Sequence, residues 1–200
     1  SLQLGHDVDL SHPHVPRPTF WAEYREFQLA VADHARSLWG DALRVGVTAT
    51  YRGLLDEPTR TVMLDLNAGS DQVNVTFKPR NPDFTAMAPA TVYEERGELL
   101  DLYNTEEIAF QSVALPSAGE TFSSQTMQSQ SLRAFLDVWD KNADRIPFAS
   151  FGRLNDPPGE AIPGELDLLD APASGVAPGY AGSLGLRGYD GDGEAKASFK

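Results

Sequence analysis

Cysteine is absent from this sequence of 200 residues, and its absence removes several classes of protein at once. Without a thiol there is no disulfide framework, no thiolate nucleophile and no cysteine-based zinc or iron–sulfur site. Basic residues are also scarce, because 16 Lys and Arg stand against 29 Asp and Glu and the formal net charge is −13. Nucleic-acid backbones are bound by basic patches, so we expect no direct nucleic-acid partner.

Long apolar runs and known signature motifs are missing as well. No stretch approaches the roughly 20 apolar residues of a membrane-spanning helix, and no basic segment followed by an apolar one opens the chain. We therefore expect no membrane partner and a location in the cytoplasm or within a virion. The sequence has no Walker loop, nucleophile elbow, zinc-protease helix or dinucleotide fingerprint, and we expect no cofactor.

Alternation of apolar and polar residues predicts three strands, at 43–51, 61–66 and 72–78. The short glycine-containing loop at 67–71 predicts that the second and third strands form an antiparallel hairpin. A second hairpin is predicted around Arg96 and Gly97, from 91–93 and 98–103, and a further strand at 108–115. A short helix starting near Asn104 is an alternative in this region, because a capping side chain precedes acidic residues there.

Two segments have helical spacing. Residues 19–39 are predicted to form a helix that ends at Gly40, and residues 132–146 to form a second. The apolar stripe of the first helix consists of Phe20, Tyr24, Phe27, Val31, Ala35 and Leu38. The predicted fold class is α+β, with the first helix packed on a mainly antiparallel sheet. We divide the chain into an extended N-terminal arm (1–18), a core domain (19–151) and a Pro- and Gly-rich extended tail (152–200).

Three clusters have side chains capable of chemistry. The N-terminal arm holds a metal-capable set, His6, Asp9, His12 and His14, but an open segment that contains proline is more often a solvated or partner-contacting arm. Carboxylates crowd between Glu94 and Glu107, where paired acids could act as general acid and base, although such a run is usually a solvated face. Residues 190–194 begin like a calcium loop, and an acidic turn is the simpler interpretation.

No catalytic, cofactor-binding or metal-binding residue is assigned, and the leading hypothesis is therefore a non-enzymatic structural or assembly subunit of a multi-subunit particle, such as a virus or phage virion. Its partners would be other protein subunits in a homo- or hetero-oligomer, because tails of this composition cannot order by themselves. The expected partner contacts are Trp21, Trp39, Phe84, Met87, Tyr180 and Tyr189.

Two alternatives remain open at this stage. The first is a small-molecule-binding or hydrolytic α+β domain, with a pocket between sheet and helix. Its polar groups would come from Tyr51, Asp65, Tyr93 or His34. The second is an acidic inhibitor or immunity-type protein that docks on a basic partner through residues 94–107.

Overall fold

The computed structural model describes residues 2–11, 18–40, 42–169, 171–189 and 193–199. The chain forms two compact units, each built from three segments of sequence. Unit 1 comprises Ser1–Phe77, Glu98–Gln111 and Asp144–Ala149, and unit 2 comprises Lys78–Gly97, Ser112–Ala143 and Ser150–Lys200.

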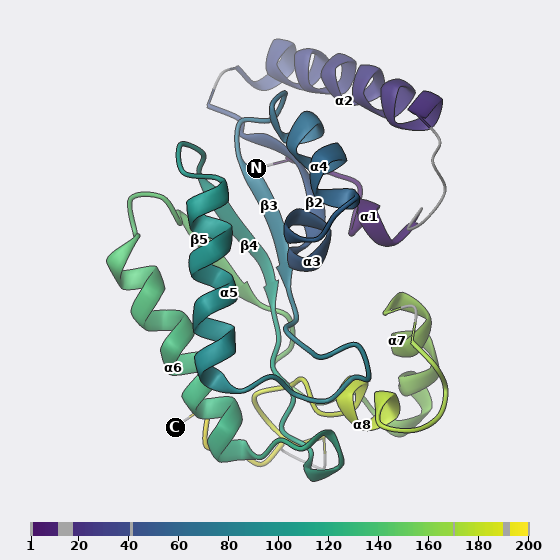
Figure 1. Ribbon diagram of the computed structural model, residues 1–200, viewed down its shortest axis with the longest axis vertical. Helices are drawn as coiled ribbons and strands as arrows, with labels where there is room; N and C mark the ends of the chain where they lie inside the picture. Colours follow the sequence, from purple (N-terminus) through teal and green to yellow (C-terminus); the bar gives the residue numbers. More distant parts are fainter. Residues whose placement is uncertain (1, 12–17, 41, 170, 190–192, 200) are drawn as a thin grey trace. The chain divides into compact units, whose positions relative to one another are not determined.

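The sheet is parallel, and its five strands follow one another in sequence order (Figure 1). The strands are β1 (Leu2–Leu4), β2 (Val45–Thr50), β3 (Val73–Phe77), β4 (Ile108–Val113) and β5 (Phe148–Phe151). In the register, Leu2 lies opposite Val45 and Thr48 lies opposite Asn74. The predicted α+β class with a mainly antiparallel sheet is therefore wrong, and the fold is α/β with helices between successive strands.

Two segments predicted as strands are helices, and this difference changes the topology. The residues predicted as the second strand lie in α4 (Thr59–Asn67), where Met63 and Leu66 are buried three residues apart. The hairpin predicted around Arg96 lies in α5 (Pro89–Leu102), where Val92, Arg96 and Leu99 are fully buried at helical steps. A helix between two strands lets them run parallel, whereas the hairpins would have reversed the chain.

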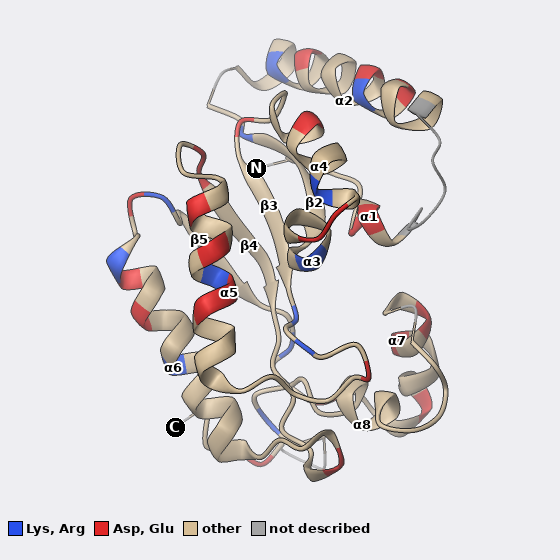
Figure 2. Cartoon of the chain, viewed as in Figure 1, with Lys and Arg blue, Asp and Glu red and all other residues tan. Residues whose placement is uncertain are grey.

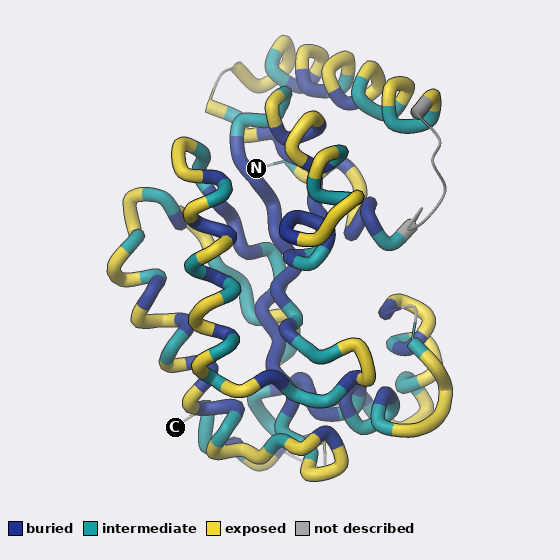
Figure 3. The backbone as a smooth tube through the Cα atoms, in the orientation of Figure 1, coloured by how far each residue is buried: buried dark blue, intermediate teal, exposed yellow. Residues whose placement is uncertain are grey.

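Unit 1 buries both faces of its central strands. Every residue of β3 is buried, and only Thr50 of β2 is partly exposed (Figure 3). The predicted first helix is present as α2 (Pro18–Trp39), but of its predicted apolar stripe only Ala35 is buried. Gln28 and Ala32 complete the buried face, and the Gln28 amide donates to the backbone of α4, while Phe27 is 56% exposed. The short helices α1 (Val8–Ser11) and α3 (Tyr51–Leu55) follow β1 and β2.

Unit 2 contains the second predicted helix as α6, which begins and ends earlier than expected. Its helices are α6 (Gln125–Lys141), α7 (Ile162–Leu168) and α8 (Ala177–Ala181), with single 3-10 turns at Gly119–Thr121 and Gly159–Ala161. The segment predicted as an extended tail contains α7 and α8, which pack together around Leu166 and Tyr180 (Figure 1). The Tyr180 hydroxyl donates to the carbonyl of Lys78, so the segment is held within its own unit.

Candidate functional site

The carboxyl ends of β1 and β2 lie side by side in unit 1, because the two strands pair in parallel. Parallel α/β folds place their functional groups at this edge, where the loops after successive strands meet. β1 is followed by Gly5, His6 and Asp7 and then by α1, which carries Asp9. The first helical residue after β2 is Tyr51, directly after Thr50.

Asp9 is fixed to the end of β2 by two hydrogen bonds. The Thr50 backbone N–H donates to Asp9 Oδ1 at 2.8 Å, and the Thr50 hydroxyl donates to Asp9 Oδ2 at 2.5 Å. Thr50 also caps α3, since its hydroxyl accepts from the Gly53 N–H at 3.0 Å. A Cβ on Gly53 would lie 2.3 Å from Asp9 Oδ2, so only glycine permits this close approach.

Asp7 is buried with one carboxylate oxygen unused. Asp7 as a whole is 7% exposed. Its backbone lies in the left-handed region at φ 45°, which few residues with a side chain adopt. Asp7 Oδ2 lies 3.5 Å from Nε2 of the exposed His6 side chain. Oδ1 has no hydrogen-bond partner among the described residues, and buried polar atoms normally have one. Asp7 Oδ1 is therefore a buried carboxylate oxygen that has no partner among the described residues.

Burial and the neighbouring charge of Asp7 alter the acidity of Asp9. Burial raises the pKa of Asp9 to about 6, the negative charge of Asp7 adds to the increase, and the bonds from Thr50 oppose it. A carboxyl group with a pKa of about 6 is protonated in about half of the molecules at pH 6 and in about a tenth at pH 7. Such a group can give a proton to a leaving oxygen, as the acid of an acid–base pair does.

The sheet face of unit 1 that carries Asn74 is buried and polar. Gln111 donates to Asn74 Oδ1 at 2.9 Å and Gln72 donates to the same oxygen at 2.6 Å, while Gln3 of β1 bonds Gln111. Asn74 Nδ2 is buried without a partner among the described residues, as is the hydroxyl of Thr48. Unpaired buried donors of this kind are places for ordered water or ligand atoms.

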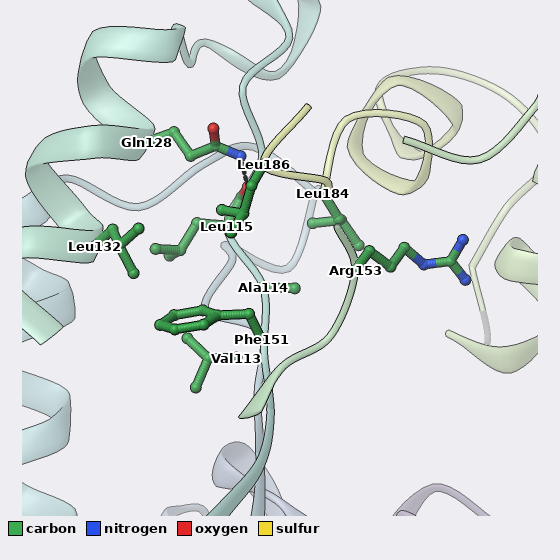
Figure 4. Close-up of a pocket in the computed structure, with 9 residues that line it drawn as sticks. All are labelled: Val113, Ala114, Leu115, Gln128, Leu132, Phe151, Arg153, Leu184 and Leu186. Carbon is green, nitrogen blue, oxygen red and sulfur yellow. Dashed lines mark hydrogen bonds between the residues drawn. The ribbon is translucent and has the colours of Figure 1, made fainter. Parts of the chain in front are cut away.

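The carboxyl ends of β4 and β5 in unit 2 surround a small apolar cavity (Figure 4). Val113, Ala114 and Leu115 follow the end of β4, and Phe151 ends β5. The cavity holds only about 10 Å³, which is room for about one water molecule. Gln128 crosses one side and donates to the Leu115 carbonyl at 2.7 Å. This region is packed core rather than a ligand site.

The expected partner-contact residues fall into two groups. Trp39 and Tyr189 are exposed, at 65% and 53%, and Trp21 is partly buried. The other three, Phe84, Met87 and Tyr180, are buried within unit 2. Burial in the core of their own unit explains why apolar residues sit in a Pro- and Gly-rich sequence.

The residues expected to supply polar groups to a pocket, Tyr51, Asp65, Tyr93 and His34, have different surroundings. Tyr51 is 2% exposed and its ring packs on Phe77, while His34 and Asp65 lie on the surface of unit 1. Tyr93 belongs to unit 2 and is 44% exposed.

The metal-capable and acidic clusters have different outcomes. His12, His14 and residues 190–192 of the expected calcium loop lie outside the described residues. Among the residues that the structure does describe, no group of three or more His, Asp or Glu could hold a metal ion. The acids between Glu94 and Asp101 lie on α5, where Figure 2 shows them as a run of acidic residues.

Sequence reasoning treated Asp9 as a potential metal ligand and gave Asp7 no role. Both follow Leu2–Leu4, a strand of only three residues in a segment that we interpreted as an arm. The available signal was a short apolar segment followed by glycine and two acids, which is typical of a strand end in an α/β fold.

Comparison with known proteins gives a likeness of fold. No protein-family model matches the chain, and no curated protein sequence matches it. An active-site mutant of Rhizomucor miehei beta-1,3-glucanosyltransferase, solved in complex with laminaritriose, is similar to the whole chain with a TM-score of 0.59 and 16% identity. A Ruminococcus gnavus β-glucuronidase in complex with D-glucuronic acid is similar over 93% of the chain with a TM-score of 0.56 and 12% identity. A calcium-binding mutant of Bacteroides uniformis β-glucuronidase 2 is similar over 97% with a TM-score of 0.57 and 11% identity.

The chain is shorter than these proteins. It spans 63% of the length of the glucanosyltransferase and 29% and 21% of the two β-glucuronidases. The described residues form a five-stranded parallel sheet with helices between the strands. This arrangement resembles part of a closed (β/α) barrel, which has eight strands.

These comparisons correct two expectations. The expectations of a virion subunit and of a non-enzymatic role are contradicted, because solved structures that are similar in fold include glycosidases and a glucanosyltransferase. The α/β fold is one that glycosidases share, which agrees better with the hydrolytic alternative than with a virion subunit. Among the described residues, no helix combines the length and the apolar character that crossing a bilayer requires.

Proposed function

We propose that this protein acts on carbohydrate, as a glycoside hydrolase or transglycosidase whose site lies at the carboxyl ends of β1 and β2. The observation that carries the proposal is the likeness of the whole chain to a β-1,3-glucanosyltransferase, at a TM-score of 0.59. The identity of 16% supports a common fold, so the chemistry is argued from the site itself.

The site supplies the kind of groups that glycoside cleavage needs. Most glycosidases use two carboxyl groups, one that protonates the leaving oxygen and one that assists attack at the sugar carbon. In this protein Asp7 has the unused buried oxygen, so Asp7 is the carboxylate that would contact the sugar. Asp9 is the carboxyl group with the raised pKa and would hold the proton.

The surroundings of Asp9 orient its carboxyl group and hold its proton to a higher pH than usual. Thr50 orients Asp9 through two hydrogen bonds, which fixes the carboxyl group relative to the strand end. Burial, with a smaller contribution from the charge of Asp7, raises the pKa of Asp9 to about 6. Asp9 can therefore act as the proton donor of the pair.

The test is product formation from laminaritriose and from an aryl β-glucuronide, with the 200-residue protein and three variants. We expect measurable cleavage or transfer by the wild type with at least one of these sugars, and a loss of about a hundredfold or more in Asp7→Asn. Asp9→Asn should lower the rate and remove the alkaline limb of the pH–rate profile, because a proton donor that titrates near 6 acts only while it is protonated. Asp33→Asn, whose side chain is 81% exposed on α2, is the matched control and should behave as wild type.

A wild-type protein that forms no product from any β-linked sugar would overturn the proposal. An Asp7→Asn variant with full activity would overturn the assignment of the site.

A further inference from the structure

We infer that a groove between α2 and α4 of unit 1 binds a short neutral oligosaccharide, at a place separate from the strand ends. Its volume is about 560 Å³, within the range of about 300 to 1,000 Å³ that small-molecule sites occupy. Its walls include Trp21, Arg25 and Glu26 from α2 and Thr61, Val62 and Asp65 from α4.

The two helices are tied together beside the groove, so its shape is fixed before a ligand arrives. Gln28 donates from its amide to the Leu66 carbonyl at 3.1 Å and to the Ser70 hydroxyl at 2.8 Å. A Cβ on Gly69 would lie 3.0 Å from Leu29 Cδ2, so the absence of a side chain at Gly69 allows this close approach. A site that is already formed loses less free energy to ordering when it binds.

Trp21 supplies a flat apolar surface that its neighbours hold in place. The Phe20 ring stands edge-on to the indole with a centroid distance of 5.0 Å, and the Tyr24 ring does so at 6.2 Å. The indole is therefore oriented by two edge-to-face contacts while it remains partly exposed. An oriented and accessible ring can stack on the C–H face of a pyranose.

The rim of the groove supplies hydrogen-bonding groups around that ring. Arg25 Nη1 lies 3.0 Å from Asp65 Oδ1 across the groove, while Arg25 Nε is buried without a hydrogen-bond partner among the described residues. The Glu26 carboxylate adds acceptors, and the Thr61 hydroxyl, which donates to the Glu57 carboxylate at 3.0 Å, can also accept. Sugar hydroxyls donate as well as accept, so they can bond to acceptors of this kind.

The charge of the groove selects between neutral and acidic sugars. The charges of Arg25 and Asp65 offset each other, and Glu26 leaves the groove with a net negative charge. A negative groove repels a carboxylate, so a uronic acid should bind more weakly than a neutral glucan. The choice of a sugar as ligand rests on the proposed function, whereas the position of the site rests on the groove residues alone.

The test is calorimetric titration of the 200-residue protein with laminaritriose and, separately, with D-glucuronic acid. We expect saturable binding of laminaritriose that weakens by about tenfold or more in Trp21→Ala. Val62→Trp, which fills the groove without removing the indole, should weaken binding in the same way. Trp39→Ala is the matched control, because Trp39 is a 65% exposed indole at the other end of the same helix.

Asp7→Asn separates this inference from the proposed function, because it changes the strand-end site and leaves the groove intact. If laminaritriose binds in the groove but the protein turns over no sugar, only the proposed function is overturned. If the protein turns over sugar but its affinity for laminaritriose is the same in the wild type, Trp21→Ala and Val62→Trp, only the inference about the groove is overturned. An absence of laminaritriose binding, or equal weakening by Trp39→Ala, would also overturn it.

Discussion

Replacing Asp9 by asparagine should make the protein more stable near neutral pH. Asparagine keeps both contacts with Thr50, since its oxygen accepts from the backbone N–H and its amide can donate to the hydroxyl that Asp9 now accepts from. Only the buried charge is removed. The folded pKa of about 6 against an ordinary value of 3.8 corresponds to about 3 kcal/mol in the free energy of unfolding.

The sign of the pH dependence follows from the raised pKa of Asp9. Below 3.8 the carboxyl group is protonated in both the folded and the unfolded chain, and no charge is buried. As the pH rises from 3.8 to about 6, the unfolded chain releases its proton first and the folded state loses stability relative to it. Above about 6 the folded protein carries the full cost of a buried carboxylate.

Urea unfolding at about pH 4.5 and about pH 7.5 measures this contribution in the wild type, Asp9→Asn and Asp33→Asn. We expect Asp9→Asn to unfold with about 1 to 3 kcal/mol more free energy than the wild type at the higher pH, and with a smaller gain at the lower pH. Asp33→Asn should follow the wild type, because its side chain is 81% exposed. A variant that is less stable than the wild type at both pH values would refute the reasoning, and an unchanged pH dependence would do the same.

Three further substitutions test individual contacts, each by urea unfolding. Gly53→Ala should cost about 1 to 3 kcal/mol, since its Cβ would meet Asp9 at 2.3 Å, and an unchanged midpoint would show that the contact is not tight. Arg96→Met should raise stability by about 1 kcal/mol or more, because two buried nitrogens of its guanidinium group have no hydrogen-bond partner among the described residues. Burial also lowers the pKa of Arg96 to about 10. A loss of stability in this variant would contradict the expectation. Lys196→Met should cost about 3 to 5 kcal/mol by leaving Asp156, 2.7 Å away, without its buried partner, and an unchanged urea midpoint would contradict that.

The sequence predicted the elements that have strong periodicity and failed where two periods fit equally well. α2, β2, β3 and β4 were predicted close to their observed bounds. The run from Thr61 to Leu66 alternates like a strand, but its length of one or two turns also suits a helix, and burial of Met63 with Leu66 decides for the helix. The helical spacing of the buried residues in α5 could not be recognised from the sequence, because Arg96 occupies a core position, where a charged residue is rare.

The candidate site was missed for the same reason as the topology. A strand-end site can be recognised only once the strands are known to be parallel, because antiparallel hairpins bring no common set of carboxyl ends together. With α4 and α5 taken as strands, the sheet was antiparallel and the Asp7 and Asp9 carboxylates had no strand end to belong to. The C-terminal segment was misjudged because Leu166 and Tyr180 are far apart in sequence, and only the fold brings them into one cluster.

The most direct test of the central claim is mass spectrometry of laminaritriose products formed in H₂¹⁸O by the wild type and by Asp7→Asn. Cleavage by water would place ¹⁸O at the new reducing end, and transfer would give longer oligosaccharides without the label. The account predicts one of these two products from the wild type and neither from Asp7→Asn. Identical products from both proteins would contradict it, and so would wild-type protein that leaves both laminaritriose and an aryl β-glucuronide intact.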